Sequence, residues 1–234
     1  IAIERDKKII EAYEQKVYSH IALKQFTEAV ETAKLATDKQ RNARTFYNLG
    51  MAQDSLMKFE DAVYSFGRSK FYDAKYVNAY LGLAYSSAKL GKMDKAIESA
   101  DKAISLESDN VFAYLIRSKI HILNGHTQKA IDDVSKMISL EPKVIAHYVM
   151  RGRMYNELSQ YQSAIGDYTK CIEIDNSNYY SYYQRGKAYE GIHDVKAATK
   201  DYEALLALNP TGADKIVEEV KKSIYELNKE SNNP

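Results

Sequence analysis

The residues of this sequence that could carry out chemistry are one cysteine and five histidines. A thiolate beside an imidazole would make a nucleophilic pair, and closely spaced histidines would make a metal site. Cys171, however, falls on the apolar stripe of an expected helix, at a position where sister segments carry Ala36, Ala103 and Met137. The histidines lack metal-ligand spacing such as His-x-x-x-His, and there is no glycine-rich phosphate loop. The sequence therefore predicts no active site, no metal and no cofactor, and we expect the protein not to be an enzyme.

A row of arginines recurs every 34 residues, and each arginine is followed 16 residues later by an aspartate. The pairs are Arg117 with Asp133, Arg151 with Asp167, and Arg185 with Asp201. Two other segments replace the pair by Leu49 with Ser65 and by Leu83 with Ser99. Because arginine and aspartate occur together or not at all, we expect them to bridge two antiparallel helices rather than to contact a ligand.

These rows belong to a repeat that organises most of the chain. Its alanines are Ala29, Ala62, Ala96, Ala130, Ala164 and Ala198, separated by 33, 34, 34, 34 and 34 residues. Sixteen residues before each alanine lies an aromatic residue: Tyr13, Phe46, Tyr80, Tyr114, Tyr148 and Tyr182. Within each period, two stretches with helical spacing of apolar residues are separated by turn formers. The pattern predicts pairs of short amphipathic helices, packed closely through small residues such as Gly152.

The period and these residues resemble the tetratricopeptide repeat, a helix–turn–helix unit of 34 residues. The resemblance divides the chain into six units at 10–42, 43–76, 77–110, 111–144, 145–178 and 179–212. It implies an all-α, right-handed superhelical solenoid. The spacing of apolar residues predicts an amphipathic capping helix at 213–228, and the polar composition of 229–234 predicts a disordered tail. Residues 1–9 either lengthen the first helix or form the tail of a truncated upstream repeat. The first unit is the least regular, because it is one residue shorter and has Val17 at a position that is usually small.

The resemblance also implies that the first helix of every unit faces the concave side, where family members bind ligands. A second basic row lies there, made of Lys119, Arg153, Lys187 and Lys221. Its expected neighbours in this concave groove are Tyr85, Phe112, Leu115, Asn156, Tyr180 and Tyr183. Spaced cations with aromatic rings between them suit an extended peptide that has acidic residues or a free carboxylate. The alternative is an ordinary solvated face.

One subset of the family binds the C-terminal carboxylate of heat-shock chaperones through a fixed clamp of lysine, asparagine and arginine residues. Here Glu14 and Tyr18 stand where the first unit of that clamp needs lysine and asparagine. We therefore do not expect a chaperone-tail carboxylate clamp.

Composition limits the remaining possibilities. The chain has 33 Lys and Arg against 32 Asp and Glu, a net charge of +1, which argues against a dedicated nucleic-acid-binding protein. No stretch approaches the 18 apolar residues that would span a membrane. We expect a non-enzymatic scaffold or adapter, of a co-chaperone-like kind, that binds an extended peptide or a partner helix in the groove. The alternative is self-association through terminal helices or the groove, and a less favoured one is binding of single-stranded RNA by Tyr180, Tyr183 and Lys187. The sequence does not indicate a compartment.

Overall fold

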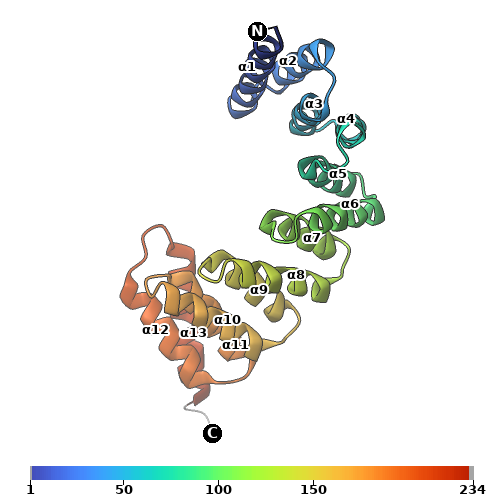
Figure 1. Ribbon diagram of the computed structural model, residues 1–234. Helices are drawn as coiled ribbons and strands as arrows, with labels where there is room; N and C mark the ends of the chain where they lie inside the picture. Colours follow the sequence, from blue (N-terminus) through green and yellow to red (C-terminus); the bar gives the residue numbers. More distant parts are fainter. Residues whose placement is uncertain (1, 232–234) are drawn as a thin grey trace. The chain divides into compact units, whose positions relative to one another are not determined.

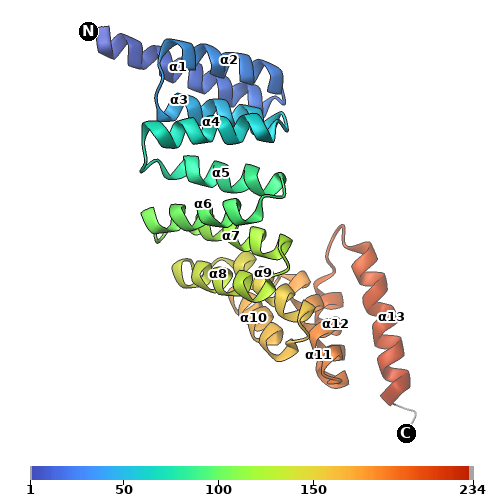
Figure 2. The ribbon, with the colours of Figure 1, turned by 90° about the vertical axis from the view of Figure 1, so that its right-hand side faces the viewer.

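The computed structural model describes the backbone of residues 2–231 and the side chains of residues 8–229. Within this part of the chain every regular element is an α-helix (Figures 1 and 2), which confirms the all-α prediction. The helices are α1 (Ala2–Ala22), α2 (Phe26–Lys39), α3 (Ala43–Ser55), α4 (Phe59–Tyr72), α5 (Val77–Lys89), α6 (Met93–Leu106), α7 (Val111–Leu123), α8 (Thr127–Leu140), α9 (Ile145–Glu157), α10 (Tyr161–Ile174), α11 (Tyr179–Gly191), α12 (Val195–Leu208) and α13 (Asp214–Ser231). Five odd-numbered helices, α3 to α11, begin at the first residues of the expected units.

A short turn joins the two helices of each pair and reverses the direction of the chain. Each of these turns contains one residue with left-handed backbone, with φ between 56° and 72°: Lys24, Met57, Gly91, Gly125, Ser159 and His193. A left-handed residue directly after a helix is a common way to end it. The turns thus recur with the same period as the alanines, although only two of them contain glycine at this position.

The chain divides within α8 into two compact bodies, one ending at Ala130 and the other beginning at Ile131. In the N-terminal body α1 pairs with α2, α3 with α4, and α5 with α6, and each second helix also packs on the next first helix. The first helices α1, α3, α5 and α7 also contact one another in order. They form a continuous surface, which we call the first-helix face.

Close helix contacts in the N-terminal body depend on residues with little or no side chain. The repeat alanines Ala29, Ala62 and Ala96 are fully buried. The ring of Phe66 in α4 lies against two glycines, so that a Cβ atom added at Gly50 or Gly82 would come within 2.8 or 2.5 Å of the ring. Since real Cβ contacts are longer than this, both glycines are needed for the ring to occupy its position.

The C-terminal body is built in the same way. Helices α9 and α10 form one pair, α11 and α12 form the next, and α9 contacts α11. A Cβ atom added at Gly152 would lie 2.9 Å from the ring of Tyr168, and one at Gly186 would lie 2.4 Å from the ring of Tyr202. Small residues therefore permit the close approach that the sequence predicted, with a buried tyrosine ring in the role that Phe66 has in α4.

The ends of the chain differ in detail from expectation. Helix α13 packs on α12 and buries Val220 and Leu227. It continues to Ser231, so the expected disordered tail does not begin at residue 229, because no glycine or proline interrupts the helix after residue 228. The remaining tail residues, 232–234, lie outside the described part of the chain. At the other end, α1 is one unbroken helix of 21 residues that includes residues 2–9. None of the described helices combines the length and the apolar character needed to cross a membrane.

Candidate functional site

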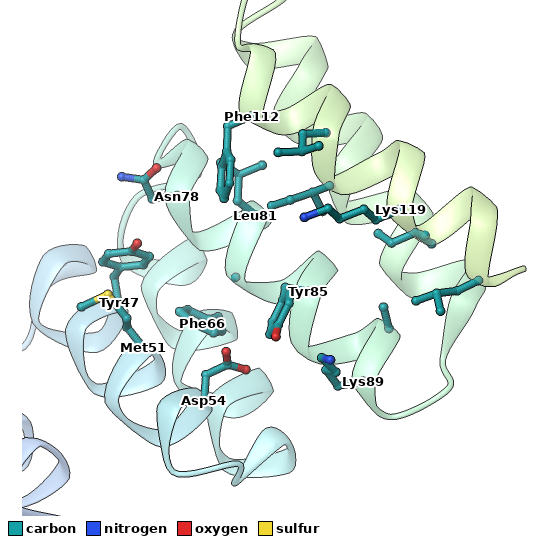
Figure 3. A pocket seen from close by; sticks show the side chains of 16 residues that line it. Tyr47, Met51, Asp54, Phe66, Asn78, Leu81, Tyr85, Lys89, Phe112 and Lys119 are labelled. Atoms are coloured by element: carbon teal, nitrogen blue, oxygen red, sulfur yellow. The ribbon is translucent and has the colours of Figure 1, made fainter. Parts of the chain in front are cut away.

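A cavity of about 470 Å³ opens on the first-helix face of the N-terminal body, between α3, α5 and α7 (Figure 3). Its lining is mostly aromatic and aliphatic. The lining residues are Tyr47, Met51 and Asp54 of α3, Phe66 of α4, Asn78, Leu81, Gly82, Tyr85, Ala88 and Lys89 of α5, and Phe112, Leu115, Ile116, Lys119, Ile120 and Leu123 of α7. Concave sites of this size with few polar groups are typical of ligand-binding sites.

Helical spacing explains why these side chains line the same cavity. On α5, Leu81, Tyr85 and Lys89 follow at intervals of four residues, so they lie on one side of the helix. On α7, Phe112 and Lys119 are seven residues apart, or two turns, and also share a side. Because Gly82 has no side chain, the ring of Phe66 from α4 reaches the cavity between the side chains of α5 and those of α7. The four predicted groove residues of this body, Tyr85, Phe112, Leu115 and Lys119, are therefore brought together.

Three ionisable side chains give the cavity its electrostatic character. Burial raises the pKa of Asp54, although a 2.7 Å hydrogen bond from the Ser86 hydroxyl and the nearby charge of Lys89 oppose the increase. The Lys89 Nζ atom lies 5.2 Å from the centre of the Tyr85 ring, at cation–π distance. Lys119 is exposed at the opening. Two cations against one partly buried carboxylate leave this site with an excess of positive charge.

Two of these groups were missed by the sequence reasoning, and a signal for one was present. Lys89 follows the predicted Tyr85 by four residues, which is one helical turn, so it could have been found from the spacing alone. Asp54 lies near the end of α3, and no predicted groove residue came from that helix. Its place in the cavity depends on the packing of α3 against α5.

In the C-terminal body the predicted basic residues have different surroundings. Lys187 of α11 forms an ion pair of 3.0 Å with Glu219 of α13, and the Tyr183 hydroxyl donates a 2.8 Å hydrogen bond to the same carboxylate. These two hydrogen bonds lower the pKa of Glu219. Lys221 pairs at 2.9 Å with Glu218 on its own helix. Glu219 of α13 is thus brought against two side chains of α11.

The other predicted residues of the C-terminal body contribute less to a common site. Arg153 is exposed on α9. The Asn156 amide lies 3.5 Å from the buried Tyr168 hydroxyl. The rings of Tyr180 and Tyr183 lie with their centres 6.3 Å apart. Arg153 is the only charged residue among these, and its side chain is exposed to solvent.

Comparisons with known proteins agree with the repeat pattern. A sequence model for the tetratricopeptide repeat matches residues 77–110, 148–178 and 179–211. These three segments of the chain are tetratricopeptide repeats. The first matched segment coincides with the third expected unit, and the other two fall within the fifth and sixth. No curated protein sequence matches the chain.

Solved structures with the same repeats are similar to this chain in fold. The C-terminal part of a TPR repeat-containing protein from Cytophaga hutchinsonii has a TM-score of 0.81 at 18% identity, with 94% of this chain and 89% of that chain covered. MamA has a TM-score of 0.64 at 24% identity, with coverage of 74% and 94%. YrrB, described as a TPR protein with an unusual peptide-binding site, has a TM-score of 0.62 at 15% identity, with coverage of 84% and 97%. Together with the helix pairs, these likenesses establish a TPR-like helical solenoid.

The first two expected units carry a buried acidic network on the first-helix face. The Glu14 side chain is only 4% exposed and forms an ion pair with Arg44, whose Nε atom donates a 2.8 Å hydrogen bond to it. The Tyr18 hydroxyl lies 3.2 Å from the same carboxylate, and burial together with this charge raises the pKa of Tyr18 to about 12. A carboxylate thus occupies the place where the chaperone-tail clamp needs a lysine.

The Arg–Asp pairs of the C-terminal tetratricopeptide repeats bridge their two helices as expected. Arg151 donates from Nε and Nη2 to both oxygens of Asp167 at 2.9 and 2.7 Å. Arg185 holds Asp201 in the same bidentate geometry, at 2.7 Å for both bonds. Each guanidinium also reaches the preceding second helix, since Arg151 donates to Ser135 and Arg185 to Thr169, both at 2.9 Å. These arginines are therefore structural.

Cys171 is a buried thiol in the core of these repeats. Burial raises its pKa to about 11, so that little thiolate forms at neutral pH. Among the described residues, no group of three or more His, Cys, Asp or Glu side chains is arranged to hold a metal ion.

Proposed function

We propose that this protein is a non-enzymatic scaffold or adapter that binds an extended peptide or a helix of a partner protein in the cavity between α3, α5 and α7. The observation that carries the proposal is the combination of an apolar cavity of about 470 Å³ with the ammonium groups of Lys89 and Lys119 at its edge. The peptide-binding site in the name of YrrB supports the same kind of role, although its sequence is only 15% identical.

The cavity supplies the two contributions that protein interfaces usually combine. Tyr85 and Phe112 are 44% and 57% exposed, so a partner that covers them removes aromatic surface from water. Such desolvated aromatic residues commonly provide most of the binding free energy, whereas charges at the rim favour the correct partner and increase the association rate. The excess positive charge favours a partner segment with acidic residues. Arg153 and Tyr180 remain candidate contacts in the C-terminal body.

The alternatives have less support. The RNA hypothesis used Tyr183 and Lys187, which are both bonded to Glu219. A carboxylate at that position disfavours a phosphate backbone. The buried carboxylate of Glu14 would likewise repel the C-terminal carboxylate of a bound peptide, which disfavours a chaperone-tail clamp at that position.

The proposal is tested by affinity capture from the native lysate with the wild-type chain and two variants. Lys119→Glu reverses the charge at the opening of the cavity, and Lys102→Glu makes the same change on an exposed residue of α6 as a matched control. We expect a partner that is retained by the wild type and by Lys102→Glu but lost from Lys119→Glu. Circular dichroism checks that the variants fold.

Two results would contradict the proposal. Equal capture by all three proteins would show that the cavity is not the binding site. If the captured protein is a second copy of this chain, light scattering should show a concentration-dependent oligomer, and self-association would replace the scaffold hypothesis.

A further inference from the structure

The second helix of the second repeat, α4, carries an aromatic surface that the proposed function does not use. Tyr64, Arg68 and Phe71 follow at i, i+4 and i+7, which places them on one face of the helix. Tyr64 is 68% exposed and Phe71 is 74% exposed. Phe46 of α3 and Tyr72 complete the group, which we call the Arg68 cluster.

Contacts between rings and guanidinium give this cluster a defined geometry. The rings of Phe46 and Tyr72 are stacked with their centres 5.4 Å apart, and Phe71 meets Tyr72 edge-on at 5.7 Å. The central carbon of the Arg68 guanidinium lies 5.0 Å from the ring centre of Phe71, 5.4 Å from that of Tyr72 and 5.6 Å from that of Phe46. Cation–π attraction of this kind holds a guanidinium in a preferred orientation.

The positive charge of Arg68 lacks an acidic partner among the residues that the structure describes. Its hydrogen bond there is a long one, 3.4 Å from Nη2 to the Tyr72 hydroxyl. A guanidinium has five N–H donors in a planar fork that matches a carboxylate. Most of these donors remain available to a group from outside the chain.

The repeat fold does not require the exposed aromatic residues of this cluster. At the position of Phe71, the four later units carry Ser105, Ser139, Glu173 and Ala207. At the position of Tyr64, they carry Glu98, Asp132, Gly166 and Lys200. Four units thus form the same helix with polar or small residues, so the two exposed rings of α4 are not there to maintain the fold.

The fifth unit indicates what the cluster lacks. There, Lys170 takes the position of Arg68 and forms an ion pair of 2.8 Å with Glu173, which takes the position of Phe71. In α4 the carboxylate is replaced by a ring that stacks on the cation. The charge is therefore preserved while its partner is removed.

We propose that the Arg68 cluster is a second protein-binding surface, which takes a partner segment with a carboxylate next to an apolar side chain. The carboxylate binds the free edge of the guanidinium, in the role that Glu173 has for Lys170. The apolar side chain covers the exposed rings of Phe71 and Tyr64. A scaffold with this surface would hold two segments at once, one in the cavity between α3, α5 and α7 and one on α4.

The test selects ligands from a phage-displayed library of random 16-residue peptides on the wild-type chain. Peptides recovered from the selection are synthesised with a fluorescent label, and binding is measured by anisotropy. Two variants use residues that sister units carry at the same positions: Arg68→Leu, as at residue 35, and Phe71→Ser, as at residue 105. Lys102→Leu makes the same type of change at the equivalent position of α6 and is the matched control.

We expect one class of recovered peptides to combine Asp or Glu with an adjacent Leu, Ile, Phe or Trp. Arg68→Leu and Phe71→Ser should each weaken this class about tenfold or more, a change of about 1.4 kcal/mol. Lys102→Leu should have no effect. Lys119→Glu should not affect this class either, so that failure of the cavity proposal and failure of this one are distinguishable.

Three results would overturn the inference. The first is that no such class is recovered. The second is that its peptides bind Arg68→Leu and Phe71→Ser as tightly as the wild type, with all proteins folded by circular dichroism. The third is that a labelled oligothymidylate binds more tightly than any recovered peptide and depends on Phe71, which would identify a surface for single-stranded nucleic acid instead.

Discussion

The bidentate pair of Arg151 and Asp167 allows a sharp test of how the repeats are held together. The Asp167 side chain is 6% exposed and that of Arg151 is 20% exposed, so both charges are largely removed from water. Arg151→Leu leaves a buried carboxylate without its partner, and we expect a loss of about 3–5 kcal/mol in the free energy of unfolding. Asp167→Ser should cost less, about 1–3 kcal/mol, because the arginine is more exposed and keeps its bond to Ser135.

The double variant is the decisive protein. The second and third repeats carry Leu with Ser at these two positions, so the combination of Arg151→Leu with Asp167→Ser already exists in this fold. Replacing both members of a buried ion pair is often close to neutral, and we expect a cost of about 1 kcal/mol. The two single changes should therefore be non-additive by about 3 kcal/mol or more.

Urea is the appropriate denaturant, since it does not screen charges as a salt does. Unfolding of the four proteins is followed by circular dichroism, and hydrogen exchange of α9 and α10 reports the local stability in case the repeats unfold separately. The exposed pair of Lys170 and Glu173 serves as a control, for which the coupling should be much smaller because both charges are solvated. If the double variant loses as much as the two single variants together, the pair is not coupled and the structural role is refuted.

The remaining predictions concern packing and pH. Gly82→Ala should lower the free energy of unfolding by about 1–3 kcal/mol, because the added methyl group would overlap the ring of Phe66. Gly67→Ala should instead raise it by about 0.5–1 kcal/mol, because nothing lies within 4 Å of the added Cβ atom. Thermal unfolding of both variants checks the contrast. The lowered pKa of Glu219 means that its bonds stabilise the fold above the ordinary glutamate value of 4.5 and are lost as the pH falls below it. Glu219→Gln should therefore reduce the loss of stability between neutral and acidic pH, and Glu218→Gln should not; parallel acid titrations decide this.

Periodicity in the sequence was sufficient to predict the helix pairs. The spacing of alanines, aromatic residues and small residues reflects contacts that every pair must make, so each unit repeats the same signal. The bidentate Arg–Asp pairs were also predictable, since the two residue types vary together from unit to unit. The left-handed turn residues were not predicted, because residues as different as Met57 and His193 occupy that position.

The cavity could be predicted only in part. Tyr85 and Lys119 were found because they occupy one register of the first helix. Asp54 was not found, because its approach to the cavity depends on how closely α3 and α5 pack. That distance is controlled by the glycines beside Phe66, and Gly82 lies outside the position of Gly50 and Gly152, which is small in five of the six expected units.

Lys119 and Lys187 show why register alone does not identify a binding residue. Both occupy the same position in a first helix, yet Lys119 is exposed at a cavity and Lys187 is bonded to Glu219. The difference comes from the end of the chain. Continuing the arginine row by 34 residues from Arg185 leads to Glu219, so the last helix carries a negative charge where three repeats carry a positive one. The sign change converts a residue that would repel Lys187 into one that binds it, and it can be read from the sequence once the repeat is extended into α13.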